Sequence, residues 1–449
     1  MQKIVIKKFK QISHAEIELR DFLFLIGEQA SGKSTIAKLI YFFKSLKQEY
    51  ISLAGQLKEL TTSDFKTALI HSIQDKFNVY FGFTTRLDDE FEVIYYFSEE
   101  EDLYIKLSKA NALKITFGRG FSTRLSSQTT ALKHSITTLS RQSGGQGRSN
   151  SAIQQRLRDS VNQKIQETAN TVFCDERECL FLPAGRNITV SYPEQFQLLF
   201  FGELQSAVAA KKDSNTIDLL LIRDFVNYSK LLADYFADRD TIVDEESPFM
   251  QRIAQNIAGI LHAHYINQNG YEKLFYGDNE YTPLNIASSG QQESIRLIQD
   301  ALYILHEDFQ ASRIVEEPET HLFPTAQKLL IQLMILVANK TNSQVIITTH
   351  SPQVQATFNN LLYYTRVLGN KPELREAIED RFGTTLFNEQ NREHLNVLAD
   401  KFQAYSLRPG EDVYCKSIVD EETHLIGENN IDEATESIYD EFDFLYSLL

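Results

Sequence analysis

The stretch "FLFLIGEQASGKSTIAKLI", residues 22–40, decides the fold of this 449-residue chain. Five apolar residues lead through a glycine-rich turn into a segment whose apolar residues recur at helical spacing. The centre, "GEQASGKST" (27–35), fits G-x-x-x-x-G-K-[ST] between a strand and a helix, the context that separates a phosphate-binding loop from a chance match. We therefore predict an α/β fold with a P-loop.

Each residue type in this loop has a physical role. Gly27 and Gly32 let the backbone curl so that its N–H groups face a phosphate, and the following helix adds the positive end of its dipole. Lys33 is expected to reach the β- and γ-phosphates of ATP, and Ser34 to ligate Mg²⁺. The expected ATP-binding set is Gly27, Glu28, Gln29, Ala30, Ser31, Gly32, Lys33, Ser34 and Thr35.

A second stretch, "SRIVEEPETHLFP" (312–324), places Glu316, Glu317 and Glu319 directly after a β-branched pair. Carboxylates crowded at the end of an apolar segment repel one another unless a cation or a reaction needs them. We expect Glu316 to hold Mg²⁺ and Glu317 to orient or deprotonate the water that attacks the γ-phosphate. A solvated acidic turn is the alternative, and the metal-side acid is Glu where Asp is more usual.

Two shorter segments flank the acids. "NIASSGQQESIRLI" (285–298) has Ser-Ser-Gly-Gln-Gln at the start of an expected helix, and "VIITTHSPQ" (345–353) ends a strand in His350. Alone, the first is often a helix cap and the second a structural histidine. The order of P-loop, SGQQ, acids and histidine is specific.

With its motifs in this order, the sequence resembles the ATP-binding-cassette (ABC) ATPases. Among these ATPases it resembles the RecF/SMC/Rad50-like branch. "EEPETHLFP" and "TTHSP" resemble the subgroup of overcoming-lysogenisation-defect proteins and phage-defence ATPases such as those of the Septu and PARIS systems. The resemblance covers roughly residues 1–45 and 285–355. It implies a head-to-tail dimer in which Ser289, Gly290 and Gln291 close over ATP bound by the other subunit, and a catalytic role for His350.

The resemblance and the secondary-structure pattern together divide the chain into five parts. We expect the N-terminal part of the ATPase core at 1–50, an antiparallel β lobe at 51–120, a large, mostly helical insertion that serves dimerisation at 121–280, the rest of the core at 281–365, and an extension with an acidic tail at 366–449. Within the lobe, "FNVYFGF" (77–83) is expected to be a strand, and 141–151 a loop. No heptad pattern predicts an extended coiled coil.

Composition limits the remaining choices. The net charge is −16, of which −11 lies in residues 411–449, so the total gives no support to broad nucleic-acid binding. The three cysteines favour a reducing compartment, and the longest apolar runs fall far short of the roughly 20 residues that cross a bilayer. We expect a cytoplasmic protein without membrane contact.

Three functions remain open. The leading one is the Mg²⁺-dependent ATP switch of a bacterial anti-phage complex that controls a separate nuclease or toxin. The alternative is a RecF-like ATPase of DNA repair or chromosome maintenance. A transporter subunit is weakest, because Lys33 and Glu316 lie too far apart in sequence for a compact cassette.

Several residues keep open roles. Gln142 and Gln146 are candidates for the Q-loop glutamine, and Lys8, Phe9 and Lys10 for adenine contacts. Arg186, in "PAGR", faces either the nucleotide or an interface, or is structural. The tail intersperses apolar residues among its acids, so we expect it to dock on a partner or on this chain, with disorder as the alternative.

Overall fold

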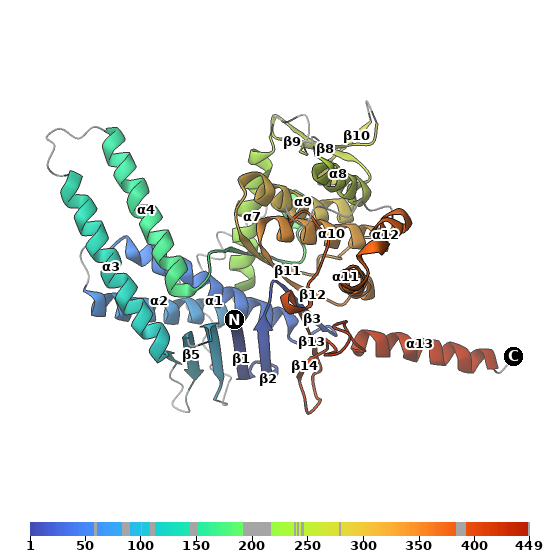
Figure 1. The fold of residues 1–449 in the computed structure, drawn as a ribbon, viewed down its shortest axis with the longest axis horizontal. Helices are drawn as coiled ribbons and strands as arrows, with labels where there is room; N and C mark the ends of the chain where they lie inside the picture. The colour runs from blue at the N-terminus through green and yellow to red at the C-terminus, as the bar shows by residue number, and fades with distance from the viewer. Residues whose placement is uncertain are drawn as a thin grey trace. The chain divides into compact units, whose positions relative to one another are not determined.

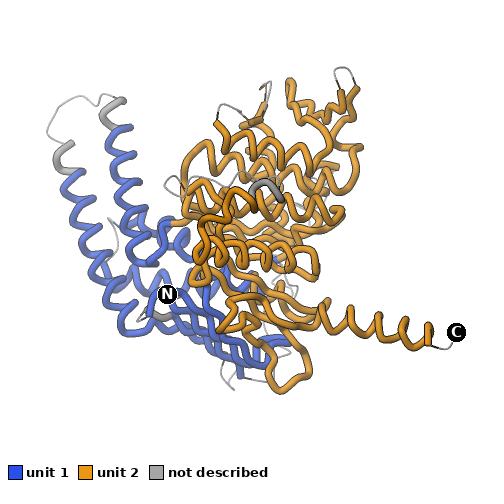
Figure 2. The backbone as a smooth tube through the Cα atoms, turned by 45° about the vertical axis from the view of Figure 1, so that its right-hand side comes forward, with its two compact units in different colours: residues 1–19, 38–176, 211–217 blue, residues 20–37, 177–210, 218–449 orange. Residues whose placement is uncertain are grey.

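The computed structural model describes residues 1–57, 61–82, 90–99, 101–107, 113–143, 151–191, 217–237, 239, 242–243, 247–277, 280–382 and 392–447. The chain divides into two compact units (Figure 2). Unit 1 comprises residues 1–19, 38–176 and 211–217, and unit 2 comprises residues 20–37, 177–210 and 218–449. Each unit is described below by itself.

Unit 2 is built on a six-stranded sheet of order β14-β13-β3-β12-β11-β7 (Figure 1). Its strands are β3 (Phe22–Gly27), β7 (Glu178–Leu182), β11 (Ala311–Glu316), β12 (Gln344–Thr349), β13 (Phe402–Leu407) and β14 (Cys415–Ser417). All pairs are parallel except β13–β14. Every residue of β3, β11 and β12 is buried, as expected for parallel strands covered on both faces. These three strands confirm the sequence assignments.

Helices of unit 2 cover this sheet and carry most of its apolar core. They are α5 (Ile188–Ser191), α7 (Ile217–Tyr235), α8 (Pro248–Leu261), α9 (Ser289–Glu307), α10 (Pro324–Thr341), α11 (Pro352–Asn370) and α12 (Arg375–Phe382). A small antiparallel sheet of β8 (His264–Gln268), β9 (Tyr271–Phe275) and β10 (Tyr281–Pro283) leads through a short 3₁₀ turn (Leu284–Ile286) into α9. The first turn of α1 (Lys33–Ala54) also belongs to unit 2.

Unit 1 contains an antiparallel sheet of order β2-β1-β4-β5-β6. Its strands are β1 (Gln2–Phe9), β2 (Ile12–Leu19), β4 (Glu92–Ser98), β5 (Glu101–Leu107) and β6 (Leu113–Phe117). In β2 the buried residues alternate from Ala15 to Leu19, as in a strand with one face on the core, whereas β1 buries Ile4, Val5 and Ile6 in succession. The expected antiparallel lobe is therefore present, and β1 and β2 are part of its sheet.

The expected strand at residues 77–83 is wrong over Phe77–Phe81, which end helix α2 (Thr62–Phe81). A stripe at four-residue spacing decides the helix, because Phe65, Leu69, Ile73 and Phe77 all fall on its buried face. Phe77 packs on Phe9, with ring centroids 6.0 Å apart. The helical stripe is longer than the β-forming segment at 77–81 and determines its structure. Residues 83–89 lie outside the described residues.

Helices α3 (Arg119–Ser143) and α4 (Ser151–Phe173) lie side by side as a long hairpin (Figure 1). Phe121 of α3 and Phe173 of α4 pack with ring centroids 5.6 Å apart. The sequence analysis expected no coiled-coil arm, but the buried positions of α3 follow steps of four and three residues from Phe121 to Ile136. Serines and threonines dilute this pattern, which is why apolar periodicity alone did not reveal it. The expected loop is helical up to Ser143 and from Ser151; residues 144–150 lie outside the described residues.

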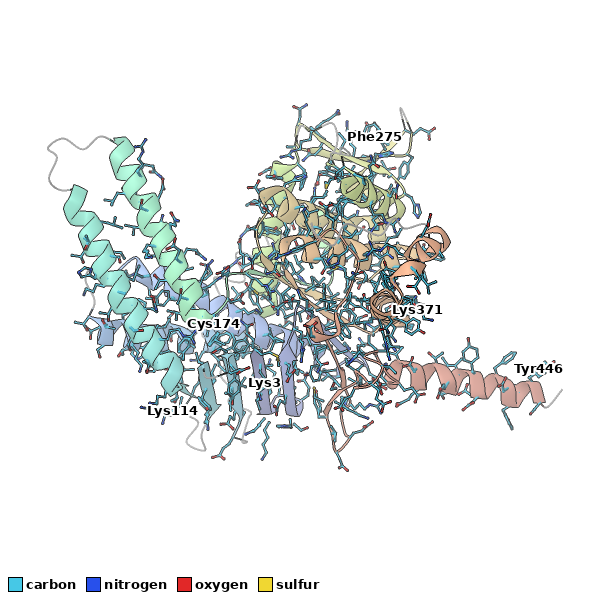
Figure 3. The ribbon with its side chains drawn as sticks, in the orientation of Figure 1. Lys3, Lys114, Cys174, Phe275, Lys371 and Tyr446 are labelled. Carbon is cyan, nitrogen blue, oxygen red and sulfur yellow. The ribbon has the colours of Figure 1, made fainter. Side chains whose placement is uncertain are left out.

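The C-terminal extension has two different parts. Strand β13 joins the sheet beside β3, whereas the segment Asn430–Ser447 forms helix α13, in which no residue is buried. Figure 3 shows the α13 side chains standing out from the helix, among them the labelled Tyr446. Among the described residues, no helix is long and apolar enough to cross a membrane.

Candidate functional site

The predicted site residues lie at one edge of the large sheet of unit 2. Strand β12 lies between β3 and β11, and Thr348 is paired both with Leu25 of β3 and with Glu316 of β11. The carboxyl ends of parallel strands meet at the same edge, where ligands of such sheets bind. The P-loop, the acidic turn after β11 and His350 after β12 are therefore brought together.

The P-loop connects β3 to α1 with a backbone that needs glycine. A Cβ on Gly27 would lie 2.7 Å from Ser31 Oγ and 2.9 Å from the carbonyl oxygen of Leu407, so any larger residue would displace the loop. Gly32 has a φ of 92°, in the left-handed region that side chains disfavour. The amide of Ser31 donates to the carbonyl of Glu28 (3.3 Å), which closes the loop.

Lys33 lies in the centre of the site with its ammonium group on the loop itself. Its Nζ donates to the carbonyl oxygens of Gly27 (2.6 Å) and Glu28 (2.7 Å). Burial lowers the pKa of Lys33, and the negative charges of Glu317, Glu319 and Glu28 oppose this shift. The lysine is thus close enough to both the P-loop and the acidic turn to interact with each.

The acidic turn has a constrained backbone. Glu317 has a φ of 43°, which costs energy for a residue with a side chain, and its N–H donates to the carbonyl of Thr348 (2.9 Å). Its carbonyl accepts from the Thr320 hydroxyl (2.8 Å). The Glu317 carboxylate points toward the histidine, with Oε1 3.5 Å from His350 Nδ1.

Glu319, for which no role was predicted, holds the end of β12 beside the predicted site residues. It is 5% exposed, and its Oε1 accepts from the Thr349 hydroxyl (2.6 Å) and from the His350 N–H (3.1 Å). These bonds fix the end of β12 and hence the start of the histidine segment. The three neighbouring acids therefore differ in environment, with Glu317 partly exposed and Glu316 and Glu319 buried.

Arg186 resolves to a structural position. It is 0% exposed, and its guanidinium donates to the carbonyl oxygens of Glu316 (Nη1, 2.7 Å) and Glu317 (Nη2, 3.1 Å). Its Nε forms an ion pair with Glu293 Oε2 of α9 (3.2 Å), and its backbone N–H donates to the same oxygen (3.0 Å). Because the side chain is completely buried within its own chain, Arg186 faces neither a nucleotide nor an interface. The arginine instead connects α9 to the acidic turn.

The SGQQ segment forms the start of α9. Ser288 is the N-cap, and its hydroxyl and N–H both donate to Gln291 Oε1 (3.0 and 3.2 Å), a capping box. Gln291 Nε2 donates to the carbonyl of Leu261 (2.7 Å), so this side chain is engaged within its own chain. Ser289 is exposed. A Cβ on Gly290 would lie 2.6 Å from the carbonyl oxygen of His321, so the glycine allows α9 to pack on the acidic turn.

The C-terminal extension contributes to the P-loop, which the sequence analysis missed. Tyr414 donates from its hydroxyl to the carbonyl of Ser31, and burial raises the pKa of Tyr414 to about 12. Strand β13 pairs with β3 up to Gly27. The β-forming residues Phe402, Tyr405 and Leu407 before a Pro-Gly turn are the signal that would have identified this strand.

The site fits a phosphate. The cradle is open where Gly27 lacks a Cβ, and Ser31 Oγ is buried without a hydrogen-bond partner among the described residues. The charge of Lys33 is met at hydrogen-bond distance by two neutral carbonyl oxygens, so an anion would be better matched.

The oxygen donors also fit Mg²⁺. Ser34 and Glu316 offer a hydroxyl and a carboxylate, ligands that this ion prefers. No group of three or more acidic, histidine or cysteine side chains forms a metal site in the described part of the chain. This is compatible with an ion that takes most of its ligands from water and from phosphates of the substrate.

Other predicted contacts have different outcomes. Phe9 is completely buried in the aromatic core of unit 1, so its ring is a core residue and has no free face for adenine. Lys8 is exposed near the end of β1, and its adenine contact stays a prediction. Lys10 lies over the Phe81 ring (5.4 Å). The Gln142 side chain and Gln146 lie outside the described residues.

The match to a protein-family model identifies an ATPase family. The sequence model described as AAA ATPase domain matches residues 1–354. No curated protein matches the chain.

Solved structures similar to the chain include three Smc head domains. An Smc head bound to the C-winged helix domain of ScpA shares 14% identity (79% of this chain and 90% of that chain covered, TM-score 0.38). An Smc head with an extended coiled coil, bound to the C-terminal domain of ScpA derived from Pyrococcus furiosus, shares 13% (80% and 92%, TM-score 0.36). A Thermotoga maritima SMC head domain shares 10% (79% and 90%, TM-score 0.34).

Proposed function

This chain belongs to the AAA ATPase domain family, and from that membership we propose that it is an ATP-driven switch that hydrolyses ATP at the sheet edge of unit 2. The observation that carries the proposal is the position of Glu317. Its carboxylate lies 3.5 Å from His350 and close enough to Lys33 to oppose the lowered pKa of that lysine. A carboxylate between a phosphate-binding lysine and a histidine has the surroundings expected of the group that activates water.

The residues of the site take different roles in hydrolysis. The loop Gly27–Thr35 binds the phosphates, and Lys33 leaves its carbonyl partners to neutralise the β- and γ-phosphates. Ser34 and Glu316 would hold Mg²⁺, which would neutralise phosphate charge. Glu317 accepts a proton from water or orients it, and His350 holds the Glu317 carboxylate and contacts the γ-phosphate from the end of β12.

We further propose a homodimer with two shared ATP sites, of the ABC type in the RecF/SMC/Rad50-like branch. Ser289 is exposed at the N-terminus of α9, where backbone N–H groups and the helix dipole favour an anion. The exposed Ile286 and Phe323 lie just before α9 and α10 and supply apolar surface beside that terminus. Because Gln291 caps its own helix, Ser289 and Gly290 are the residues proposed to contact ATP of the other subunit.

The finer part of the proposal concerns what the switch controls. Helix α13 carries six acidic and no basic residues, and it exposes an apolar stripe at steps of four and three residues, Ile438, Phe442 and Leu445. Two such helices would repel each other, and nucleic acid or an anionic membrane would repel either. We propose that α13 binds an apolar groove with a basic rim on a separate effector protein, a nuclease or toxin of an anti-phage complex.

The test is a triple variant, Ile438→Ser with Phe442→Ser and Leu445→Ser, co-expressed with the product of the adjacent gene. Loss of co-purification with ATP hydrolysis unchanged is expected, because the substituted side chains are exposed and distant in sequence from the site. Phe444→Ser is the matched control, since Phe444 lies among the acids on the other side of the helix. Full-yield co-purification by the triple variant would contradict the docking role.

One observation favours the alternative function, a RecF-like ATPase that binds DNA. Helix α3 contains four basic and no acidic residues, in a chain that is acidic overall, and Arg156 and Arg158 of α4 are exposed. This function predicts that the chain binds duplex DNA and that the logarithm of the binding constant falls linearly with the logarithm of the salt concentration. The double variant Arg156→Glu with Arg158→Glu should bind the DNA more weakly than the wild type. If the chain does not bind DNA even at low salt, the DNA-binding function is contradicted and control of an effector protein remains as the proposed function.

A further inference from the structure

We propose that Arg186 is a positioning residue that couples the start of α9 to the orientation of Glu317. The inference rests on the proposed function, because it assigns to one buried side chain the connection between the two halves of a shared ATP site. When Ser289 of one subunit contacts ATP bound by the second subunit, Arg186 would transmit the resulting displacement of α9 to the Glu317 carboxylate of the subunit that contains this Ser289.

The first step of the argument is the geometry of the arginine. One planar guanidinium bridges two elements, since Nε pairs with Glu293 of α9 (3.2 Å) while Nη1 and Nη2 reach the carbonyl oxygens of Glu316 (2.7 Å) and Glu317 (3.1 Å). Nη1 also donates to the carbonyl of Pro183 (2.9 Å), which anchors the side chain to the end of β7. A rigid fork of donors cannot follow Glu293 without moving the two carbonyls.

The second step concerns what those carbonyls control. Glu317 has a left-handed backbone, a conformation that persists only where its surroundings hold it. Its N–H is held by Thr348, and its carbonyl by Thr320 and Arg186. A change at the carbonyl rotates the peptide and with it the direction of the carboxylate.

The third step is the contrast with the rest of α9. Two further buried ion pairs lie along this helix: Arg296 with Glu272 of β9 (2.6 Å) and Asp300 with Arg313 of β11 (2.9 Å). They hold its middle to the neighbouring strands and touch neither Glu316 nor Glu317. Of the three ion pairs, the one with Glu293 lies nearest to Ser289, four residues away. Displacement of the first turn would therefore reach Arg186 through Glu293, in addition to the direct packing of Gly290 on His321.

A mutant cycle with three readouts tests this coupling. Arg186→Lys keeps the charge but loses the fork, and Ser289→Arg blocks the exposed end of α9. We expect Arg186→Lys to keep the affinity for a non-hydrolysable ATP analogue within about twofold and to lower kcat about 10- to 100-fold. In the Ser289→Arg background the same change should lower kcat by less than about twofold, because the signal it conveys is already absent.

Amide hydrogen exchange of residues 316–322 supplies a readout besides turnover. In the wild type the analogue should slow exchange at the Glu317 N–H, and in Arg186→Lys this slowing should be lost although the analogue still binds. Arg296→Lys is the matched control, because Arg296 is a buried arginine of α9 that contacts neither Glu316 nor Glu317. Its effect on kcat should be additive with that of Ser289→Arg. If Arg186→Lys does not fold, Glu293→Gln enters the same cycle.

Additive losses in the cycle, or loss of nucleotide binding in Arg186→Lys, would overturn the coupling and leave Arg186 a merely structural residue. The failure of the proposed function looks different. In that case the wild type itself would neither bind the analogue nor hydrolyse ATP, and the cycle would have no starting value.

Discussion

The P-loop and the acidic turn lie at the same sheet edge but are held in different ways. The P-loop is closed mostly by its own residues, since the partners of Lys33 are five and six positions away. The acidic turn depends on Arg186, which is 130 residues from Glu316 and 131 from Glu317. The residues of a locally closed loop decide by themselves how the loop binds its ligand. The conformation of a turn that is held by residues distant in sequence can change when those distant parts of the chain move.

Lys33→Ala should have the largest effect. Removing the ammonium group takes away the main charge that meets the phosphates, so affinity for ATP should fall by at least about 100-fold with the fold intact. Calorimetric titration measures the affinity, and Lys416→Ala, an exposed lysine on β14, is the control. Because burial lowers the pKa of Lys33 and only the charged form attracts phosphate, wild-type affinity should decline with rising pH earlier than an ordinary lysine predicts. Retained affinity in Lys33→Ala would move the ligand away from the P-loop.

Glu317→Gln tests the other region of the comparison. The amide keeps the size of the side chain but cannot accept a proton, so ATP should still bind while kcat falls about 100- to 10,000-fold. Single-turnover hydrolysis measures the loss. Glu319→Gln is the matched variant, because an amide oxygen can still accept from Thr349 and His350, and its kcat should fall less than about tenfold. Equal losses in both would reassign the base.

Mixing two chains that each retain only a small residual activity asks whether the P-loop and the start of α9 meet across a dimer. Lys33→Ala spoils the P-loop face and Ser289→Arg the α9 face, so an equal mixture should recover about one quarter of wild-type activity, from mixed dimers with one intact site. Ser289 is preferred to Gly290 because any side chain at Gly290 would strike His321 of its own chain. Inactivity at every mixing ratio, with both variants folded, would argue against shared sites.

Tyr414→Phe should have the smallest effect. It removes one hydrogen bond to the Ser31 carbonyl, worth about 1 kcal/mol, so affinity for ATP should fall about fivefold at most. Tyr363→Phe, on an exposed tyrosine of α11, is the control. A loss as large as that of Lys33→Ala would mean that the P-loop is not closed locally, and the comparison above would fail.

The same contrast explains what the sequence could predict. The P-loop, β11, β12 and the start of α9 were identified because their signals are contiguous: a glycine pattern, apolar runs and a cap. Residues 77–81 were assigned wrongly because a five-residue β-forming pattern was weighed over a longer helical stripe. The roles of Arg186, Glu319 and Tyr414 had no local signal, since each depends on a partner far along the chain, and distance in sequence hides such pairs.

The place of β3 in its sheet has a consequence for biosynthesis. Residues 22–27 leave the ribosome more than 300 residues before their neighbours in the sheet, which are β12 at 344–349 and β13 at 402–407. The apolar strand that leads into the P-loop therefore remains without its partners until β12 and β13 have been translated. Such a delay exposes an aggregation-prone segment and makes chaperone binding advantageous. A nascent chain would acquire nucleotide affinity only after β12 and β13 have been translated, so a product that stops before them would be unable to act as a switch.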